Sequence, residues 1–260
     1  MPREDADELW RVGEALADAA AARCLPLFRN AARVCDNKAG PGSYDPVTEA
    51  DREAERAMRA ILATERPEDG IFGEEFGETA GRSGLTWVLD PIDGTRAFLA
   101  GAPSWGVLIG LDAGEGPVLG IIDQPYTGER FMGGFGRAAL RRGESERALA
   151  VRKCRDLSEA VLLTTYPVVG SAAEQAGFEA GRDRVRFTRY GLDCYAYALV
   201  ALGQVDLVIE AGLEPYDIQG PQAVVEAAGG IVTDWQGGPA HRGGRVIAAG
   251  DRKVHEAALE

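Results

Sequence analysis

Two aspartates stand three residues apart in the segment WVLDPIDGTRAF, which spans residues 87–98. An apolar run leads into the first aspartate, Pro91 is expected to end the strand, and a helix is expected to begin near Arg96. The polar residues between strand and helix are Asp90, Asp93, Gly94 and Thr95. Carboxylates at a strand end, followed by Gly-Thr, would place metal ligands beside backbone N–H groups that can bind a phosphate. The alternative is a plain turn with an Asx cap, because Asp, Pro and Gly dominate turns.

Further acids occur in two other segments. Glu74 and Glu75 follow a short apolar run in the glycine-rich segment IFGEEFG. Asp217 stands at the expected start of a helix after the apolar run VDLVIEA. If it is the N-cap, Pro221 falls at the fourth helical position, where its missing N–H costs no bond. The alternatives are a solvated turn acid at Glu74 and a simple helix cap at Asp217.

Charge and cysteine usage limit the partners and the compartment. With 41 acidic and 28 basic residues, the net charge of −13 would repel a nucleic acid, and no basic cluster stands out. A phosphate ester is also an anion, so its site would need bound divalent cations. The N-terminus carries acids, and the Ala-rich stretch 15–22 is too short to span a bilayer. Four scattered cysteines without a CxxC pair favour a reduced, cytoplasmic chain.

Two helices are expected to precede the first strand. Apolar residues at helical spacing predict one helix over about residues 5–33, bent near Pro26. Thr48 and Asp51 have the spacing of a capping box, and the helix that they open is expected to end before Pro67.

The strands are expected in two arrangements. Short apolar runs between Gly, Pro and Asp turns predict a meander over residues 86–89, 105–111, 117–123 and 129–135. After the polar stretch 141–147, strands alternate with helices, which indicates α/β layers. We expect a single domain over residues 1–260, with an N-terminal lobe of about residues 1–150 and a C-terminal lobe of about 151–260.

The motifs DPVTEAD, GEE and DPIDGT, with a late Asp followed by GAGG-like spacing, resemble the inositol monophosphatase family of lithium-sensitive, Mg²⁺-dependent phosphatases. The resemblance covers about residues 5–259. It implies an α/β (α+β) fold, a layered α-β-α-β-α sandwich, often as a homodimer. The metal ligands that it implies are Glu74, Asp90, the Ile92 carbonyl, Asp93 and Asp217. It also implies that Gly94 and Thr95 bind phosphate, and that Glu74 and Thr95 orient the attacking water.

Bound cations would explain such a carboxylate cluster. Acids this close would raise one another's pKa values unless hard cations neutralised them, and two or three Mg²⁺ would do so. One ion could lower the pKa of a bound water, and another could neutralise the leaving oxygen. No covalent phosphoenzyme is then required, and both histidines, His241 and His255, are expected at the surface.

Four positions qualify the resemblance. Tyr216 replaces the tryptophan that the family usually has before the late Asp, an aromatic exchange that preserves packing. The lysine that often precedes the DPVTEAD-like segment would be Lys38, here with a longer loop to Asp45. Asp51 is either adjacent to the metal ligands or only the capping acid, and Glu75 is expected beside the ligands.

Within the family, WVLDPIDGTRAFLAGAPSWGVLIGL and RYGLDCYAYALVALGQVDLVIEAGLEPYD are most similar to the histidinol-phosphate phosphatase branch. Leu192 stands where that branch usually has a second glycine. The resemblance implies that Arg189, Asp193 and Glu210 contact the substrate. The two carboxylates would face the cationic amine or imidazole of histidinol phosphate. The alternatives are a helix cap at Asp193 and a strand-end surface acid at Glu210.

Other activities compete with this one. An inositol-1-monophosphatase or a 3′(2′),5′-bisphosphate nucleotidase would use the same motifs on another small phosphate ester. A binding protein without catalysis is the non-enzyme alternative, and it is disfavoured because no metal ligand of the pattern is missing.

Overall fold

The computed structural model describes residues 3–30, 35–37 and 46–259, so Lys38 and Asp45 lie outside the described residues. Its helices are α1 (Arg3–Cys24), α2 (Glu49–Glu65), α3 (Thr95–Ala100), α4 (Ala172–Arg182), α5 (Tyr195–Ala201), α6 (Pro215–Ala227) and α7 (Arg252–Leu259), with a 3₁₀ turn at Leu157–Glu159.

The first sheet has eight strands in the order β10-β9-β8-β7-β6-β5-β3-β4. Neighbouring strands are antiparallel except β3 and β5, which are parallel. The strands are β3 (Gly70–Gly73), β4 (Gly77–Thr79), β5 (Thr86–Asp93), β6 (Gly106–Asp112), β7 (Pro117–Gln124), β8 (Glu129–Gly134), β9 (Arg137–Arg142) and β10 (Ser145–Ala148). A separate pair, β1 (Cys35–Asn37) and β2 (Pro46–Thr48), is antiparallel.

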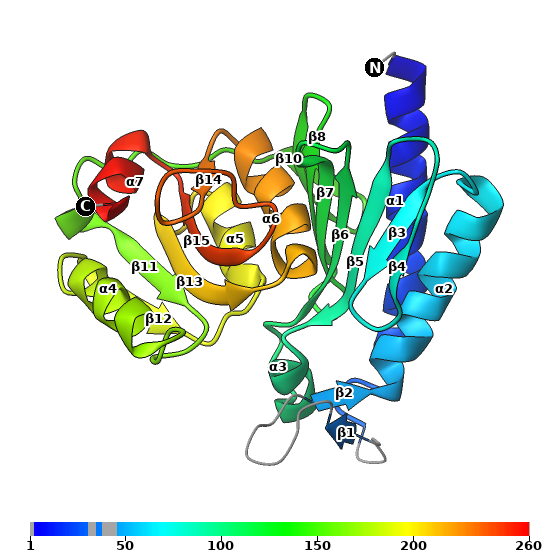
Figure 1. Ribbon diagram of the computed structural model, residues 1–260, viewed down its shortest axis with the longest axis horizontal. Coiled ribbons are helices and arrows are strands. Elements are labelled where there is room, and N and C mark those ends of the chain that lie inside the picture. Colours follow the sequence, from blue (N-terminus) through cyan, green and yellow to red (C-terminus); the bar gives the residue numbers. More distant parts are fainter. Residues whose placement is uncertain (1–2, 31–34, 38–45, 260) are drawn as a thin grey trace.

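The second sheet has five strands in the order β12-β11-β13-β15-β14. They are β11 (Val161–Thr164), β12 (Phe187–Tyr190), β13 (Leu207–Leu213), β14 (Ile231–Thr233) and β15 (Gly244–Ala249). Figure 1 shows α1 and α2 on the outer face of the first sheet, α5 and α6 between the two sheets, and α4 and α7 beyond the second. The predicted α-β-α-β-α sandwich is confirmed.

Glycines let α6 lie directly on the first sheet. A Cβ at Gly120 of β7 would lie 2.1 Å from the carbonyl oxygen of Gly220, and one at Gly133 of β8 would lie 2.5 Å from that of Ala223. Any side chain at these positions would push the helix away. Because α6 also contacts β5, this close packing places the first turn of α6 beside the end of that strand.

The predicted first helix was too long. α1 ends at Cys24, and residues 25–29 form turns, because Pro26 has no N–H to continue the helical bonding. The capping box at Thr48 is confirmed, and α2 ends at Glu65, before the next proline as predicted.

The structural positions predicted for two prolines, Pro91 and Pro221, were wrong. Pro91 does not end its strand, since β5 continues to Asp93 with a register shift against β6 after Asp90. An interrupted ladder tolerates a residue that lacks an N–H. α6 begins at Pro215, so Pro221 lies inside the helix and leaves the carbonyl four residues earlier without its helical partner.

Other features had no apolar pattern to reveal them. α4 has only Phe178 fully buried, and the polar stretch 141–147 belongs to the hairpin β9–β10, which is held by backbone pairing. His255 is buried, contrary to expectation, with its Nε2 2.7 Å from Thr233 Oγ1.

None of the described helices is long and apolar enough to cross a bilayer. The three cysteine side chains that the structure describes are free thiols.

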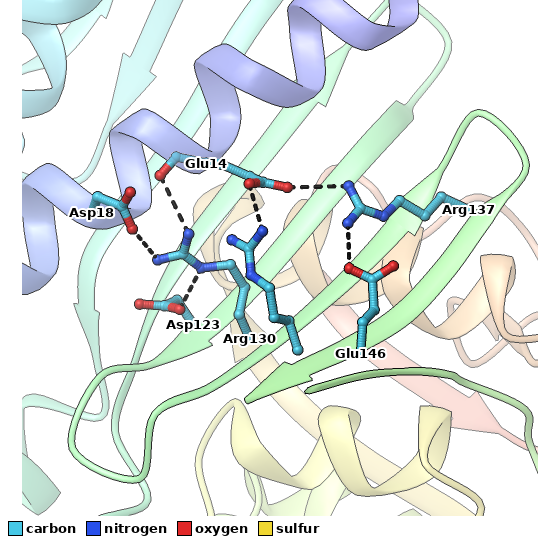
Figure 2. Close-up of polar contacts among 7 residues, drawn as sticks. Glu14, Asp18, Asp123, Arg130, Arg137 and Glu146 are labelled. Atoms are coloured by element: carbon cyan, nitrogen blue, oxygen red, sulfur yellow. Dashed lines mark hydrogen bonds and ion pairs between the residues drawn. The ribbon is translucent and has the colours of Figure 1, made fainter. Parts of the chain in front are cut away.

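Ion pairs fasten α1 to the first sheet (Figure 2). Arg130 of β8 donates from Nε to Asp123 Oδ1 at 2.6 Å and from Nη2 to Asp18 Oδ1 on α1 at 2.7 Å. Nearby, Arg137 donates from Nη1 to Glu14 Oε1 at 3.1 Å. The Asp123 side chain is only 6% exposed, so its charge depends on Arg130 for neutralisation.

Replacing Arg130 with Met is expected to lower the free energy of unfolding by about 3–5 kcal/mol, because Asp123 would remain buried without its cation. Urea denaturation measures this loss. The more exposed pair at Arg137 provides the control, and Arg137→Met is expected to cost about 1 kcal/mol or less. Equal losses for the two variants would contradict this account of the network.

Candidate active site

Three aspartates from two distant segments meet at the end of β5. One carboxylate oxygen from each of Asp90, Asp93 and Asp217 lies within 4.8 Å of the others. The bulge in β5 presents the first two, and α6 supplies the third. Asp217 is not the N-cap, which is Glu214. It is the third helical residue, and its Oδ2 accepts a hydrogen bond from Glu214 N at 2.7 Å. It therefore takes part in the capping box and also in the acidic cluster.

Burial and mutual repulsion raise the pKa of each of these acids. The pKa of Asp90 lies well above its ordinary value because of burial and the nearby carboxylates of Glu74 and Asp93. That of Asp93 is raised by burial and by Asp193, although Cys194 N donates to its Oδ2 at 2.6 Å. Burial raises the pKa of Asp217 to about 7. A cluster made only of carboxylate oxygens fits hard divalent cations, which would neutralise this repulsion.

A second acidic group adjoins the first. Carboxylate oxygens of Asp51, Glu74 and Glu75 lie within 4.8 Å of one another. Asp51 Oδ2 accepts hydrogen bonds from Thr48 N at 2.7 Å and from Thr48 Oγ1 at 2.6 Å. Its Oδ1 is buried and has no hydrogen-bond partner among the described residues, and burial raises the pKa of Asp51 to about 6. The capping interpretation of Asp51 therefore accounts for one of its oxygens, and a bound cation would supply a partner for the other.

These pKa shifts predict that the metal-free protein loses stability as pH rises. Asp51 and Asp217 titrate at about 6 and about 7 in the folded state, against 3.8 ordinarily. Between those values the folded state binds more protons than the unfolded state, so the free energy of unfolding falls with pH. Denaturation in EDTA is expected to give a lower thermal midpoint at pH 8 than at pH 5, and excess Mg²⁺ is expected to reduce the difference. A midpoint that rises with pH in EDTA would refute this prediction.

The predicted phosphate-binding residues follow directly after β5. Gly94 has φ +82°, and a Cβ there would lie 2.9 Å from Asp193 Cγ, so only glycine fits. α3 begins at Thr95, whose Oγ1 donates to the Ile92 carbonyl oxygen at 3.2 Å. The predicted carbonyl ligand and the predicted catalytic hydroxyl thus lie together beside Asp93.

A cavity of about 280 Å³ opens next to these residues. Its walls include Asp93, Gly94 and Thr95 from the first half of the chain and Asp193, Glu210 and Asp217 from the second. Arg189 does not line it and is exposed on the edge strand β12, so cavity geometry lends no support to its predicted contact with substrate.

The structure contradicts the simpler alternative for each of two acids of the cavity wall, Asp193 and Glu210. The cap reading of Asp193 was wrong, because the N-cap of α5 is Cys194. Asp193 adopts φ +46° instead, and its Oδ2 accepts a hydrogen bond from Ser104 Oγ at 2.9 Å. The surface reading of Glu210 was also wrong, since this residue is only 6% exposed.

Several residues around the site escaped the sequence analysis. Glu210 Oε1 accepts from Thr165 N at 2.9 Å and from its hydroxyl, and Oε2 accepts from Tyr197 OH at 3.1 Å. On the wall of the cavity, Arg96 Nη1 donates to Tyr166 OH at 2.7 Å and joins the two halves of the chain. These contacts join residues more than ten positions apart, and no local spacing signals them.

The layered fold and this acid-lined cavity fit a phosphoric monoester hydrolase, and the comparisons with known proteins show this class. Residues 5–260 match the inositol monophosphatase family. The chain is 42% identical, over 98% of its length and 75% of the relative's, to the bifunctional phosphatase IMPL2, chloroplastic, of Arabidopsis thaliana. It is 35% identical to a histidinol-phosphatase of Streptomyces coelicolor, over 96% of this chain and 94% of that one.

Among solved structures, the fold is similar to an inositol monophosphatase from Zymomonas mobilis. The TM-score is 0.86, with 44% identity over 100% of this chain and 98% of that chain. The chain belongs to the inositol monophosphatase family, as predicted. Enzymes of this family act on small phosphate esters and use divalent metal ions, which the acidic clusters described here could bind.

Proposed function

We propose that this chain is a Mg²⁺-dependent histidinol-phosphate phosphatase, which hydrolyses L-histidinol phosphate to L-histidinol. The observation that carries the proposal is the position of Asp193, which packs against Gly94 and lines the cavity. The ammonium group of histidinol phosphate lies two carbons from the ester oxygen. A carboxylate beside the phosphate-binding backbone would therefore meet that ammonium, whereas an inositol ring offers no positive charge to it.

The acidic residues at the end of β5 suit two or three Mg²⁺. The cations would be held by Glu74, Asp90, the Ile92 carbonyl, Asp93 and Asp217, with Asp51 and Glu75 beside them. When bound, they would supply positive charge for the phosphate and lower the pKa of a water. Glu74 and Thr95 would orient the attacking water, and Gly94 and Thr95 would hold the phosphate through backbone N–H groups and a hydroxyl. Direct attack of water on phosphorus needs no covalent intermediate.

Substrate identity is tested by comparing kcat/KM for L-histidinol phosphate, inositol 1-phosphate and 3′-phosphoadenosine 5′-phosphate at saturating Mg²⁺. We expect the first to be preferred. A preference for inositol 1-phosphate would instead support the second candidate function, which the similarity to the Zymomonas mobilis inositol monophosphatase favours. The family resemblance further supports proposals of a homodimer, a cytoplasmic location and inhibition by lithium at concentrations where sodium has no effect.

A further inference from the structure

Glu55 is a fully buried carboxylate on α2 that has no assigned role in the site. It stands one helical turn after Asp51, so both side chains lie on the same face of the helix. That face packs toward the turn between β3 and β4, which carries Glu74 and Glu75. A buried carboxylate is costly unless its oxygens are well satisfied, so its partners indicate what it does.

Both carboxylate oxygens of Glu55 hold the backbone of this turn. Oε2 accepts a hydrogen bond from Glu75 N at 2.7 Å, and Oε1 accepts from Phe76 N at 3.3 Å. A Cβ at Gly73 would lie only 2.0 Å from Glu55 Oε1, so the carboxylate occupies the space beneath the turn. The backbone on both sides of Glu74 is therefore in contact with the same side chain.

The other side of the turn is tied to β5. Glu74 N donates to the carbonyl oxygen of Leu89 at 3.1 Å, one residue before Asp90. Arg59 donates from Nε to Glu55 Oε1 at 2.7 Å, and its other nitrogens donate to the Gly77 carbonyl and to a β4 hydroxyl. The turn is thus fixed between the strand that bears Asp90 and the helix that bears Glu55.

We propose that Glu55 is a positioning residue that sets Glu74 at the correct distance from Asp90 for divalent cation binding. The inference rests on the proposed metal-dependent function and adds to it a group that touches neither metal nor substrate. A carboxylate that only stabilised the fold would affect unfolding but not the affinity for Mg²⁺. Partners that orient metal ligands typically change metal affinity or activity by about 10- to 100-fold when they are removed.

The test is Mg²⁺ titration of chelator-treated protein by isothermal calorimetry, together with the Mg²⁺ dependence of phosphate release. We expect Glu55→Gln to raise the half-saturating Mg²⁺ concentration about 10- to 100-fold, while kcat at saturating Mg²⁺ stays within about threefold of wild type. Gln keeps one carbonyl oxygen as an acceptor. Glu55→Met, which keeps none, is expected to shift the half-saturation further.

Asp206→Asn is the matched control. Like Glu55, Asp206 is buried and accepts hydrogen bonds from an arginine and from a backbone N–H. The donors are Arg152 Nε at 2.7 Å and Val161 N at 2.8 Å. Asp206 differs in that it lies beside the second sheet. The Asp206→Asn variant is expected to be less stable than wild type but to bind Mg²⁺ with the same affinity. If Glu55→Gln does not fold, Arg59→Met carries the test, with a smaller shift in the same direction expected.

Two failures are distinguishable. Wild-type Mg²⁺ affinity in the folded Glu55 variants, or in Arg59→Met where that variant carries the test, would overturn the positioning role. An absence of Mg²⁺ binding by the wild-type protein would instead overturn the proposed function on which the inference rests.

Discussion

Asp93→Asn is expected to lower kcat by about 10³-fold or more, because a lost ligand to a catalytic cation removes several kcal/mol of transition-state stabilisation. The folded structure is expected to survive. Asn can still accept the hydrogen bond that Cys194 N donates to this position, and it removes one of the mutually repelling charges. The thermal midpoint in EDTA is therefore expected to equal or exceed that of wild type. Phosphate release and thermal denaturation measure the two effects.

Asp112→Asn provides the control on the same sheet. Asp112 pairs with the opposite end of β5, and its Oδ1 accepts from Gly114 N in a turn. This variant is expected to keep wild-type turnover. Full activity of Asp93→Asn would remove Asp93 from the set of metal ligands.

Asp193→Asn is expected to lower kcat/KM for L-histidinol phosphate far more than for glycerol 2-phosphate. A charge-assisted hydrogen bond to the substrate ammonium contributes about 1.5–3 kcal/mol, or roughly 10- to 150-fold in the specificity constant. Asparagine tolerates the left-handed backbone at this position and can still accept from Ser104, so the fold is expected to remain. Kinetics on the two esters at saturating Mg²⁺ measure the difference.

Glu210→Gln is the control that distinguishes a loss of ammonium recognition from a general loss of activity. Glu210 already accepts hydrogen bonds from Thr165 and Tyr197 on both oxygens, so its carboxylate supports the cavity wall. We expect its replacement to lower kcat/KM for both esters by similar factors. Equal losses on the two esters for Asp193→Asn as well would mean that Asp193 does not recognise the ammonium group.

Local motifs located candidate acids and indicated the layers, but they left plain turns and helix caps as alternatives. Asp90 and Asp93 stand in one short motif, and Asp217 follows a strongly apolar run, so each could be located without knowing its neighbours. The alternation of strands and helices after the meander likewise indicated α/β layers, and the layered α-β-α-β-α sandwich came from the family resemblance. The resemblance then joined these segments into one site, which spacing alone could not have done.

The errors come from contacts between distant residues. The continuation of β5 through Pro91 depends on a register shift against β6, and the apolar pattern carries no sign of it. Nothing in the sequence singled out Glu55, because its two amide partners lie about twenty positions further along the chain. For Asp193 the sequence left a helix cap open beside a substrate contact, and only the fold shows that the helix begins one residue later.

The most direct test of the central claim is phosphate release from L-histidinol phosphate by EDTA-treated protein as Mg²⁺ is returned. The clustered carboxylates repel the phosphate of the substrate until cations neutralise them, so we expect no turnover without metal and a saturable recovery with Mg²⁺. Full turnover in excess chelator would contradict the metal-dependent mechanism and the role assigned to Asp90, Asp93 and Asp217.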